Sequence, residues 1–516
     1  MAATAVPSYA ETPRDTLVMA FTIDDIITLD PAEIFEFTAA EYAGNTYDRL
    51  IGYDYQDVSK IYGVAAESWT ISDDGKTFTF KMRPGIKFAS GNPMTAEDAA
   101  FSLQRAIILD KSPAFILTQF GFTADNVKDK IKAVDDMTLT IETDKAYAPT
   151  FVLYCLTATI SSIVDKKLVL EHEQDGDLGY NWLKTNYAGV GPFKLRQWKA
   201  NESLILDRND DYWGGAPAMK RVIIRHIVEP ATQQLLLEKG DIDIARNLGP
   251  DQLDPLRQNP DVYIQNGVKG AVYYLGLNQK NEYLSKPKVR QALKYLVDYK
   301  GMEQTVVKDL MAIHQAFLPK GFLGALESTP FHLDVNKAKE LLAEAGYPDG
   351  FKVTMDTRNI SPIVEMAQSI QSTFGQAGIE LEIIPGDGGQ TLGKYRARNH
   401  DIYIGRWGPD YQDPHTNADT FARNPDNSDD AKSKPLAWRN AWDIPEMTKM
   451  ADAAVLERDP AKRAEMYLEI QKVHQATSPF VVMFQQTEVA GVRADTKGFI
   501  IGPSFDDNRY KDVTKQ

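Results

Sequence analysis

The stretch "IGRWGPDYQDP", residues 404–414, places a carboxylate between two large aromatic residues. Trp407 lies three residues before Asp410, and Tyr411 follows it directly. The glycine and proline residues of the stretch are typical of a loop rather than a regular helix. A carboxylate offers charge and hydrogen-bond acceptors, and aromatic rings offer apolar walls. This combination suits a binding site, although a solvated or salt-bridged loop residue explains a lone Asp equally well.

The elements around this loop determine whether its side chains meet others. Residues 402–404 have the pattern of a strand that runs into the loop. Arg358 follows another strand-like run, "FKVTMDT", and precedes Ser361, which we expect to cap the next helix. In open α/β sheets, ligands bind beyond the carboxyl ends of the strands. If the two strands share one sheet, Arg358 and Asp410 both lie where a site is expected.

The wider pattern predicts a mixed α/β fold. Residues 67–88 indicate a hairpin, with Asp73, Asp74 and Gly75 in its turn. Thr95 and Asp98 have the spacing of a helix capping box. In the C-terminal half, strand-like and helix-like runs alternate, which predicts a parallel or mixed sheet with helices on its faces.

No catalytic, cofactor or metal motif emerges, so we predict a protein that is not an enzyme. Residues 388–394, "GGQTLGK", match the skeleton of a phosphate loop, but Tyr395 stands where Ser or Thr must hold magnesium. The seven histidines are scattered without metal-binding spacing. Cys155, the single cysteine, lies in an apolar run and is best explained as a small buried residue.

Composition narrows the class further. A chain of 516 residues is expected to form two or three lobes. Its formal charge of −15 argues against a nucleic-acid surface, and no window is apolar enough for a membrane span. Ser8 and Ala10 have the spacing of a signal-peptidase site, with most of the preceding signal missing. We therefore expect export, with the mature protein starting near Glu11.

Seven stretches, in order, resemble one family: the extracellular solute-binding proteins of family 5, the dipeptide- and oligopeptide-binding components of ABC importers. The stretch nearest the family signature is "AAESWTISDDGKTFTFKMRPGIKFASGNPMTAEDAAFSLQRA". No single fragment decides the resemblance, but their order does. The stretches are residues 45–54, 65–106, 189–217, 237–245, 275–298, 337–353 and 459–484.

The resemblance implies a two-lobed periplasmic-binding-protein fold of type II, the Venus-flytrap arrangement, with an extra subdomain inserted in lobe one. It also implies a periplasmic protein, monomeric and without cofactor or metal, whose partners are a small-molecule ligand and the transmembrane subunits of an ABC permease. The expected divisions are 11–48, 185–267 and 486–516 for the core of lobe I, 49–184 for the inserted subdomain and 268–485 for lobe II.

The resemblance also assigns site residues. In peptide-binding relatives, the Asp of a Trp-x-x-Asp-Tyr/Asn motif receives the ligand's α-ammonium; this position is Asp410, with Trp407 and Tyr411 as pocket walls. A partly desolvated carboxylate suits that role, and aromatic faces add cation–π attraction. In the dipeptide-binding branch, an Arg before the helix "SPIVEMAQSIQ" holds the ligand carboxylate; this position is Arg358. The oligopeptide-binding branch has an Arg where this chain has Ile404.

The sequence differs from common peptide binders at several positions, so it does not determine the identity of the ligand. Arg406, directly before Trp407, is either a second anion contact or a surface charge, and we place Gly405 and Trp438 of "PLAWRNAWDIPE" with the ligand-binding residues. The expected ligand is a di- or tripeptide or a related zwitterionic amino-acid derivative. Alternatives are an opine, a sugar conjugate or a metal chelate, and, from another class, a peptide hydrolase.

Overall fold

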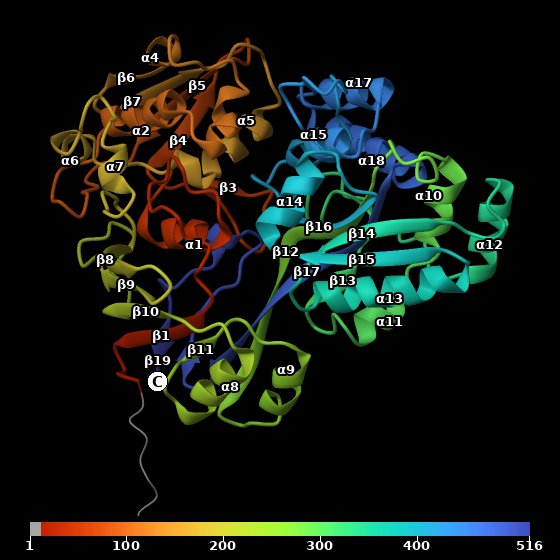
Figure 1. The fold of residues 1–516 in the computed structure, drawn as a ribbon. Coiled ribbons are helices and arrows are strands. Elements are labelled where there is room, and N and C mark those ends of the chain that lie inside the picture. The colour runs from red at the N-terminus through yellow and green to blue at the C-terminus, as the bar shows by residue number, and fades with distance from the viewer. Residues whose placement is uncertain (1–11) are drawn as a thin grey trace, which may run out of the picture. The chain divides into compact units, whose positions relative to one another are not determined.

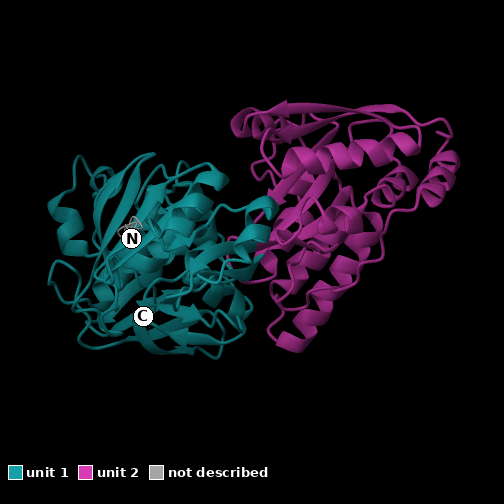
Figure 2. Cartoon of the chain, turned by 90° about the horizontal axis from the view of Figure 1, so that it is seen from below, with its two compact units in different colours: residues 1–269, 488–516 teal, residues 270–487 magenta. Residues whose placement is uncertain are grey.

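The computed structural model describes residues 12–516, which form two compact units (Figure 2). Unit 1 comprises the chain up to Lys269 together with Glu488–Gln516, and unit 2 comprises Gly270–Thr487. The chain changes unit twice, within β12 (Val262–Leu277) and within β17 (Phe480–Arg493). The expected cleavage pattern at Ser8 and Ala10 lies outside the described residues. The finer division of lobe one stays a prediction.

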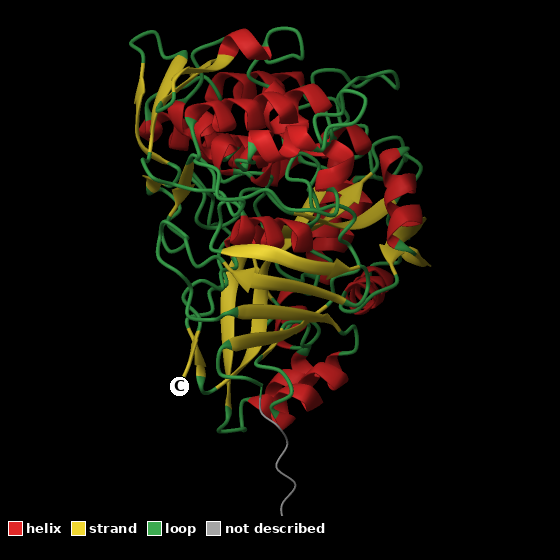
Figure 3. Ribbon diagram, turned by 90° about the vertical axis from the view of Figure 1, so that its left-hand side faces the viewer, coloured by secondary structure: helices red, strands yellow, loops and turns green. Residues whose placement is uncertain are grey.

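Unit 1 is built on a sheet with the strand order β17, β11, β1, β10, β9, β8. β1 (Thr16–Phe21) runs parallel to β11 (Ile244–Ala245) and β10 (Arg221–His226). Its sequence TLVMAF is a continuous apolar run, as expected for a parallel strand covered on both faces. β9 (Ser203–Arg208) and β8 (Phe193–Lys199) extend the sheet in antiparallel fashion (Figures 1 and 3).

A second sheet of unit 1 has the order β4, β5, β7, β6 and shares no strand with the larger one. β4 (Ala66–Ile71) and β5 (Thr77–Met82) form the expected hairpin, and Gly75 in its turn has a φ of 74°. α2 (Ala96–Leu109) packs on this sheet. These elements belong to unit 1, and a separate subdomain over residues 49–184 stays a prediction.

Shorter helices and strands complete unit 1. The helices are α1 (Phe37–Thr46), α3 (Phe115–Thr118), α4 (Val127–Lys130), α5 (Pro149–Thr157), α6 (Lys166–Glu171), α7 (Tyr180–Leu183), α8 (Pro230–Lys239) and α9 (Pro250–Leu256). The strands are β2 (Ile51–Tyr53), β3 (Ile61–Gly63), β6 (Ile131–Asp135), β7 (Thr138–Glu142), β18 (Thr496–Lys497) and β19 (Thr514–Lys515).

Unit 2 contains the parallel strands that the sequence predicted. β14 (Lys352–Arg358) lies between β15 (Glu380–Gly386) and β16 (Ile402–Trp407) and is parallel to both. β12 pairs with the other side of β16 in antiparallel fashion, and β13 (Met311–Ile313) pairs with β17. The mixed α/β class predicted from the sequence is confirmed.

Helices cover both faces of this sheet (Figure 1). α13 (Ile363–Gln376) connects β14 to β15, and α14 (Gly388–Arg396) connects β15 to β16, so both are crossovers. α13 packs with α10 and α12 on one face, and α14 to α18 contribute to a second core on the other. The other helices are α10 (Pro287–Lys294), α11 (Tyr299–Gln304), α12 (Val335–Glu344), α15 (His415–Phe421), α16 (Leu436–Arg439), α17 (Pro445–Ala454) and α18 (Pro460–Thr477).

The start of α13 differs from the sequence prediction. Pro362, rather than Ser361, occupies the N-cap position, and no side chain caps this helix. The Ser-Pro pair is compatible with a helix that begins after either residue, so the sequence pattern left the start of α13 uncertain by one residue. No helix within residues 12–516 is both long and apolar enough to cross a lipid bilayer.

Candidate functional site

The ends of two parallel strands bring the predicted charged residues to one edge of the unit 2 sheet. Met355 of β14 pairs with Ile402 of β16, and Asp356 pairs with Tyr403. Because the strands are parallel neighbours, their carboxyl ends lie at the same edge. Arg358 ends β14, and the loop with Asp410 follows β16. The two strands therefore share a sheet, as the sequence argument required.

The alternation of side chains along β16 separates Arg406 from Trp407. Tyr403 and Trp407 pack in the core shared with α14 to α18, whereas Ile402 and Ile404 belong to the core on the opposite face. Arg406 follows the second set, is exposed, and lies 3.5 Å from the side-chain oxygen of Gln486. Its direct proximity to Trp407 in the sequence therefore does not bring the two side chains to the same face.

Gly405 is buried under two tyrosine rings. A Cβ atom at this position would lie 2.6 Å from Cε1 of Tyr403 and 2.8 Å from Cζ of Tyr274. Such distances are shorter than van der Waals contact, so only glycine fits between the rings. The structure gives Gly405 a packing role, and its predicted contact with a ligand stays a prediction.

We expect Gly405→Ala to destabilise the protein by about 1 to 3 kcal/mol, because overpacking forces buried rings from their positions. A matched control is Gly393→Ala in α14, where an added Cβ meets no atom within 4 Å. Differential scanning calorimetry should show a lower Tm for the first variant and an unchanged or higher Tm for the second. An unchanged Tm for Gly405→Ala would show that the rings yield freely.

Among the residues that the structure describes, no cation pairs with the carboxylate of Asp410. Within residues 12–516, no ion pair and no hydrogen bond to this carboxylate is formed, although the Asp410 backbone N–H donates to Oγ1 of Thr416 at 3.0 Å. The residue is half-buried. Burial, and secondarily the charge of Asp419, raises the pKa of Asp410 to about 7. A cation placed here would relieve both effects.

Two neighbouring side chains also carry buried polar atoms that lack a partner among the described residues. Nε1 of Trp407 is one, and Oε1 of Gln412 is the other. Buried polar groups in folded proteins are nearly always hydrogen-bonded, to protein, water or ligand. Tyr411, between these two residues, is itself buried. The loop therefore offers a charge, a donor and an acceptor within six residues of the chain.

Arg358 lies against the start of α14. Its Nε is 3.0 Å from the position that a Cβ of Gly388 would occupy, and the residue is exposed. Helix N-termini attract anions, and a guanidinium group binds a carboxylate through two parallel bonds. No carboxylate partner of Arg358 is formed within the part of the chain that the structure describes. Arg358 and the start of α14 together suit an anionic group.

The structure does not bring Trp438 to this edge. Its Nε1 donates to the backbone oxygen of Ser428 at 2.7 Å, and the guanidinium group of Arg398 lies 3.8 Å from the centre of its ring. Arg398 precedes β16, whereas Asp410 follows it, and a strand of six residues is about 16 Å long. The ring of Trp438 thus packs near the start of β16, and its predicted contact with a ligand stays a prediction.

Two residues of this edge were not singled out from the sequence. Gln412 gave no signal beyond its polarity. Gly388 belongs to the "GGQTLGK" stretch, whose glycines were tested only as a phosphate loop. The signal that could have identified Gly388 is the position of these glycines between a strand and the start of a helix. A glycine at such a position lets a neighbouring side chain approach the backbone closely.

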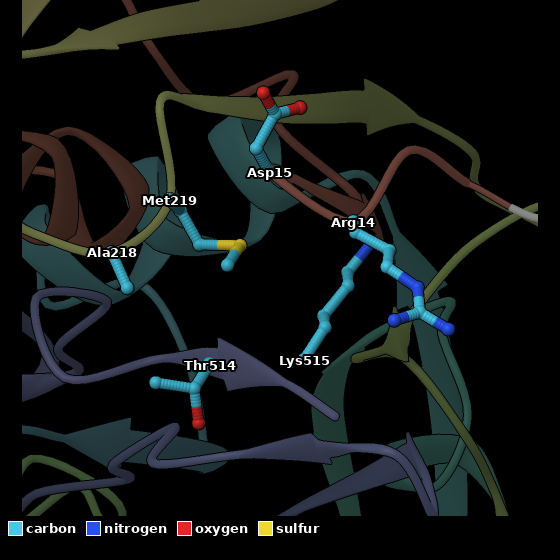
Figure 4. Close-up of a pocket in the computed structure, with 6 residues that line it drawn as sticks. All are labelled: Arg14, Asp15, Ala218, Met219, Thr514 and Lys515. Atoms are coloured by element: carbon cyan, nitrogen blue, oxygen red, sulfur yellow. The ribbon is translucent and has the colours of Figure 1, made fainter.

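A surface hollow of unit 1 is a poorer candidate. It has a volume of about 550 Å³ and is lined by Arg14, Asp15, Ala218, Met219, Thr514 and Lys515 (Figure 4). Nζ of Lys515 lies 2.7 Å from a carboxylate oxygen of Asp243, and Asp15 pairs with Lys220. These charges are already neutralised by protein groups, unlike that of Asp410.

Comparison with known proteins gives consistent matches. A model of "Bacterial extracellular solute-binding proteins, family 5 Middle" matches residues 60–429. The chain is 30% identical over 506 residues to the Escherichia coli K12 protein named "Probable D,D-dipeptide-binding periplasmic protein DdpA", covering 97% of this chain and 94% of that protein.

Solved structures match over almost the whole chain. The Helicobacter pylori periplasmic binding protein DppA, in complex with the peptide STSA, has a TM-score of 0.81 and 26% identity, covering 97% of this chain and 98% of that one. AgaA from A. tumefaciens R10, in complex with agropinic acid, has a TM-score of 0.76 over 97% of this chain and 99% of that one. At 23% identity, the second likeness shows the fold alone.

Proposed function

Since this chain belongs to the bacterial extracellular solute-binding proteins of family 5, with their two-lobed type II fold, we propose that it binds a small peptide for an ABC importer. The expected ligand is a peptide of two or three residues. In the periplasm, the protein captures this peptide between its lobes and delivers it to the permease. The observation that carries the proposal is the carboxylate of Asp410, which has no cationic partner within residues 12–516 and whose pKa is raised to about 7.

The geometry supports an ordered orientation of the peptide. Its α-ammonium binds the Asp410 carboxylate beside Trp407, and its carboxylate binds Arg358 near the start of α14. Both groups come from the same sheet edge, so one short ligand can contact both. Ile404 supplies no second arginine, which favours short peptides over long ones. Ligand binding favours the closed form only through its greater affinity for that form.

A direct test combines identification of the ligand with a cleavage assay. Mass spectrometry of the purified protein, followed by titration calorimetry with a panel of di- and tripeptides, is expected to give a peptide that binds without being cleaved. Cleavage products in the mixture would support a hydrolase instead. Binding of an opine, a sugar conjugate or a metal chelate in preference to every peptide would reject the proposed ligand class.

We expect Arg358→Ala to abolish discrimination between a dipeptide and its C-terminal amide. The wild-type protein should prefer the free carboxylate by about tenfold or more, because charge-assisted bidentate bonds are stronger than neutral ones. Arg396→Ala, an exposed arginine at the end of α14, is the matched control and should keep that preference. If Arg358→Ala also keeps it, the ligand carboxylate binds elsewhere. Calorimetric affinities of both ligands decide the question.

A further inference from the structure

The register of two neighbouring strands places Arg358 beside the start of α14. Arg358 ends β14 and is paired with Gly386, which ends β15. The backbone N–H of Asn359 donates to the oxygen of Gly386 at 2.9 Å, so the pairing continues to the ends of both strands. Only the N-cap residue Asp387 separates Gly386 from Gly388, the first residue of α14. Strand pairing thus brings Arg358 next to the first turn of this helix.

An ion pair attaches the later part of α14 to the same strand. Val353 and Met355 of β14 belong to the core on the α13 side, so Asp356 and Arg358 lie on the other face of the sheet. Asp356 is buried and pairs with Lys394, close to the end of α14. The helix is therefore held along the face of β14 on which Arg358 lies, and this attachment sets the position of its first turn.

The guanidinium group of Arg358 packs flat on the backbone of Gly388. A Cβ atom at Gly388 would lie 3.0 Å from Nε, 3.1 Å from Nη2 and 3.2 Å from Cζ of Arg358. Three atoms of one planar group at nearly equal distances show that the plane faces this position. Heavy atoms in ordinary contact are about 3.5 to 4.0 Å apart, so any side chain at residue 388 has to displace the guanidinium group.

This packing leaves the hydrogen-bond donors of Arg358 unused. Within residues 12–516, its guanidinium group forms no ion pair and no hydrogen bond. The neighbouring carboxylate, that of Asp387, accepts the backbone N–H of Gln390 at 2.8 Å and so caps the helix instead. A guanidinium group binds a carboxylate through the N–H groups at the edge of its plane. Contact of the face with glycine therefore orients the group and keeps its edge available.

We propose that Gly388 is a positioning residue: it orients the guanidinium group of Arg358 and thereby makes the site selective for peptides with a free C-terminal carboxylate. This inference rests on the proposed function, in which Arg358 binds that carboxylate. Gly388 acts through Arg358 and needs no contact with the ligand. A side chain at residue 388 would tilt the guanidinium plane and leave its charge in place. Affinity for a free carboxylate should then fall, whereas affinity for a neutral amide should not.

The test compares Gly388→Ala with Gly389→Ala in the full chain. Gly389 follows in the same helical turn, and a Cβ there meets only Oδ1 of Asp387, at 3.4 Å, so this variant is the matched control. Titration calorimetry with a dipeptide and its C-terminal amide should show a preference for the free carboxylate that is lower by about threefold or more in Gly388→Ala. Gly389→Ala should keep the preference of the wild type. Alanine suits a helix better than glycine, so neither variant should have a lower Tm.

A measurement on the ligand-free protein separates this inference from the proposed function. The NMR signal of the Arg358 Nε–H group, assigned by its loss in Arg358→Ala, should shift in Gly388→Ala and stay in place in Gly389→Ala. An unchanged preference in Gly388→Ala would overturn the inference, as would an equal loss of affinity for the dipeptide and its amide. If the wild type has no preference for the free carboxylate, the proposed function fails. The NMR signal then decides by itself: a shift supports the positioning of Arg358 by Gly388, and an unshifted signal overturns it.

Discussion

Replacing Asp410 with asparagine is expected to weaken binding of a dipeptide by about thirtyfold or more. The substitution leaves the ligand ammonium without its counter-charge, and losing one partner of a desolvated charge pair costs about 2 kcal/mol or more. Titration calorimetry at pH 8 measures the loss. Asp430→Asn, the same change at an exposed position of unit 2, is the control and should bind like the wild type. Equal affinities for the two variants would reject the role of Asp410.

The same substitution is expected to stabilise the ligand-free protein. Burial raises the pKa of Asp410 from its ordinary value near 3.8 to about 7 in the folded state. Its charge therefore costs stability at pH values above about 4, and the cost is largest above pH 7. Because the residue is only half-buried, we expect a gain of about 1 to 2 kcal/mol at pH 8 and a Tm higher by about 1 to 2 °C. At pH 4 the two proteins should melt together.

The affinity for an ammonium ligand is expected to fall as the pH drops below 7. In the free protein, Asp410 is half protonated near pH 7, and the ligand binds the charged form, so binding displaces the proton. Affinity should be highest above pH 8 and should fall by nearly tenfold per pH unit below 6. Calorimetry in two buffers of different ionisation enthalpy should show release of about half a proton at pH 7.

Neighbouring groups and a blocked ligand provide the controls for this pH dependence. Burial lowers the pKa of His415, on the adjacent α15, which favours the neutral form of this side chain. The remaining charged neighbour that bears on Asp410 is Asp419. The Asp410→Asn variant should bind with little dependence on pH, and an N-acetylated dipeptide should release no proton. If binding by the Asp410→Asn variant still depends on pH, another group is responsible for that dependence.

Much of the fold followed from local sequence patterns. Thr95 and Asp98 form the capping box that their spacing predicted, because the bonds of a helix cap involve residues three apart in the chain. The hairpin around Gly75 and the crossovers in unit 2 followed for similar reasons. The family assignment, made from the order of seven stretches, was confirmed by the match over residues 60–429.

The candidate site followed only in part. The sequence by itself identified Asp410 and Arg358 as charged residues at strand ends, since strand ends and loops are set locally. It left open whether their strands share a sheet, because strand pairing joins residues that are distant in the chain: Met355 and Ile402 meet only after two crossovers. It also grouped Arg406 and Trp438 with them, and the contact of these two side chains with a ligand stays a prediction.

The tertiary structure decided the environment of each side chain. The pleat of β16 directs Arg406 away from Trp407, and the packing of α16 places Trp438 against Arg398. The raised pKa of Asp410 depends on burial by surrounding segments and on Asp419, nine residues away. Sequence thus determined which charges this protein carries at the edge of its sheet. Only the folded chain determined which of them are left without a partner, because desolvation and pairing depend on residues that local patterns do not connect.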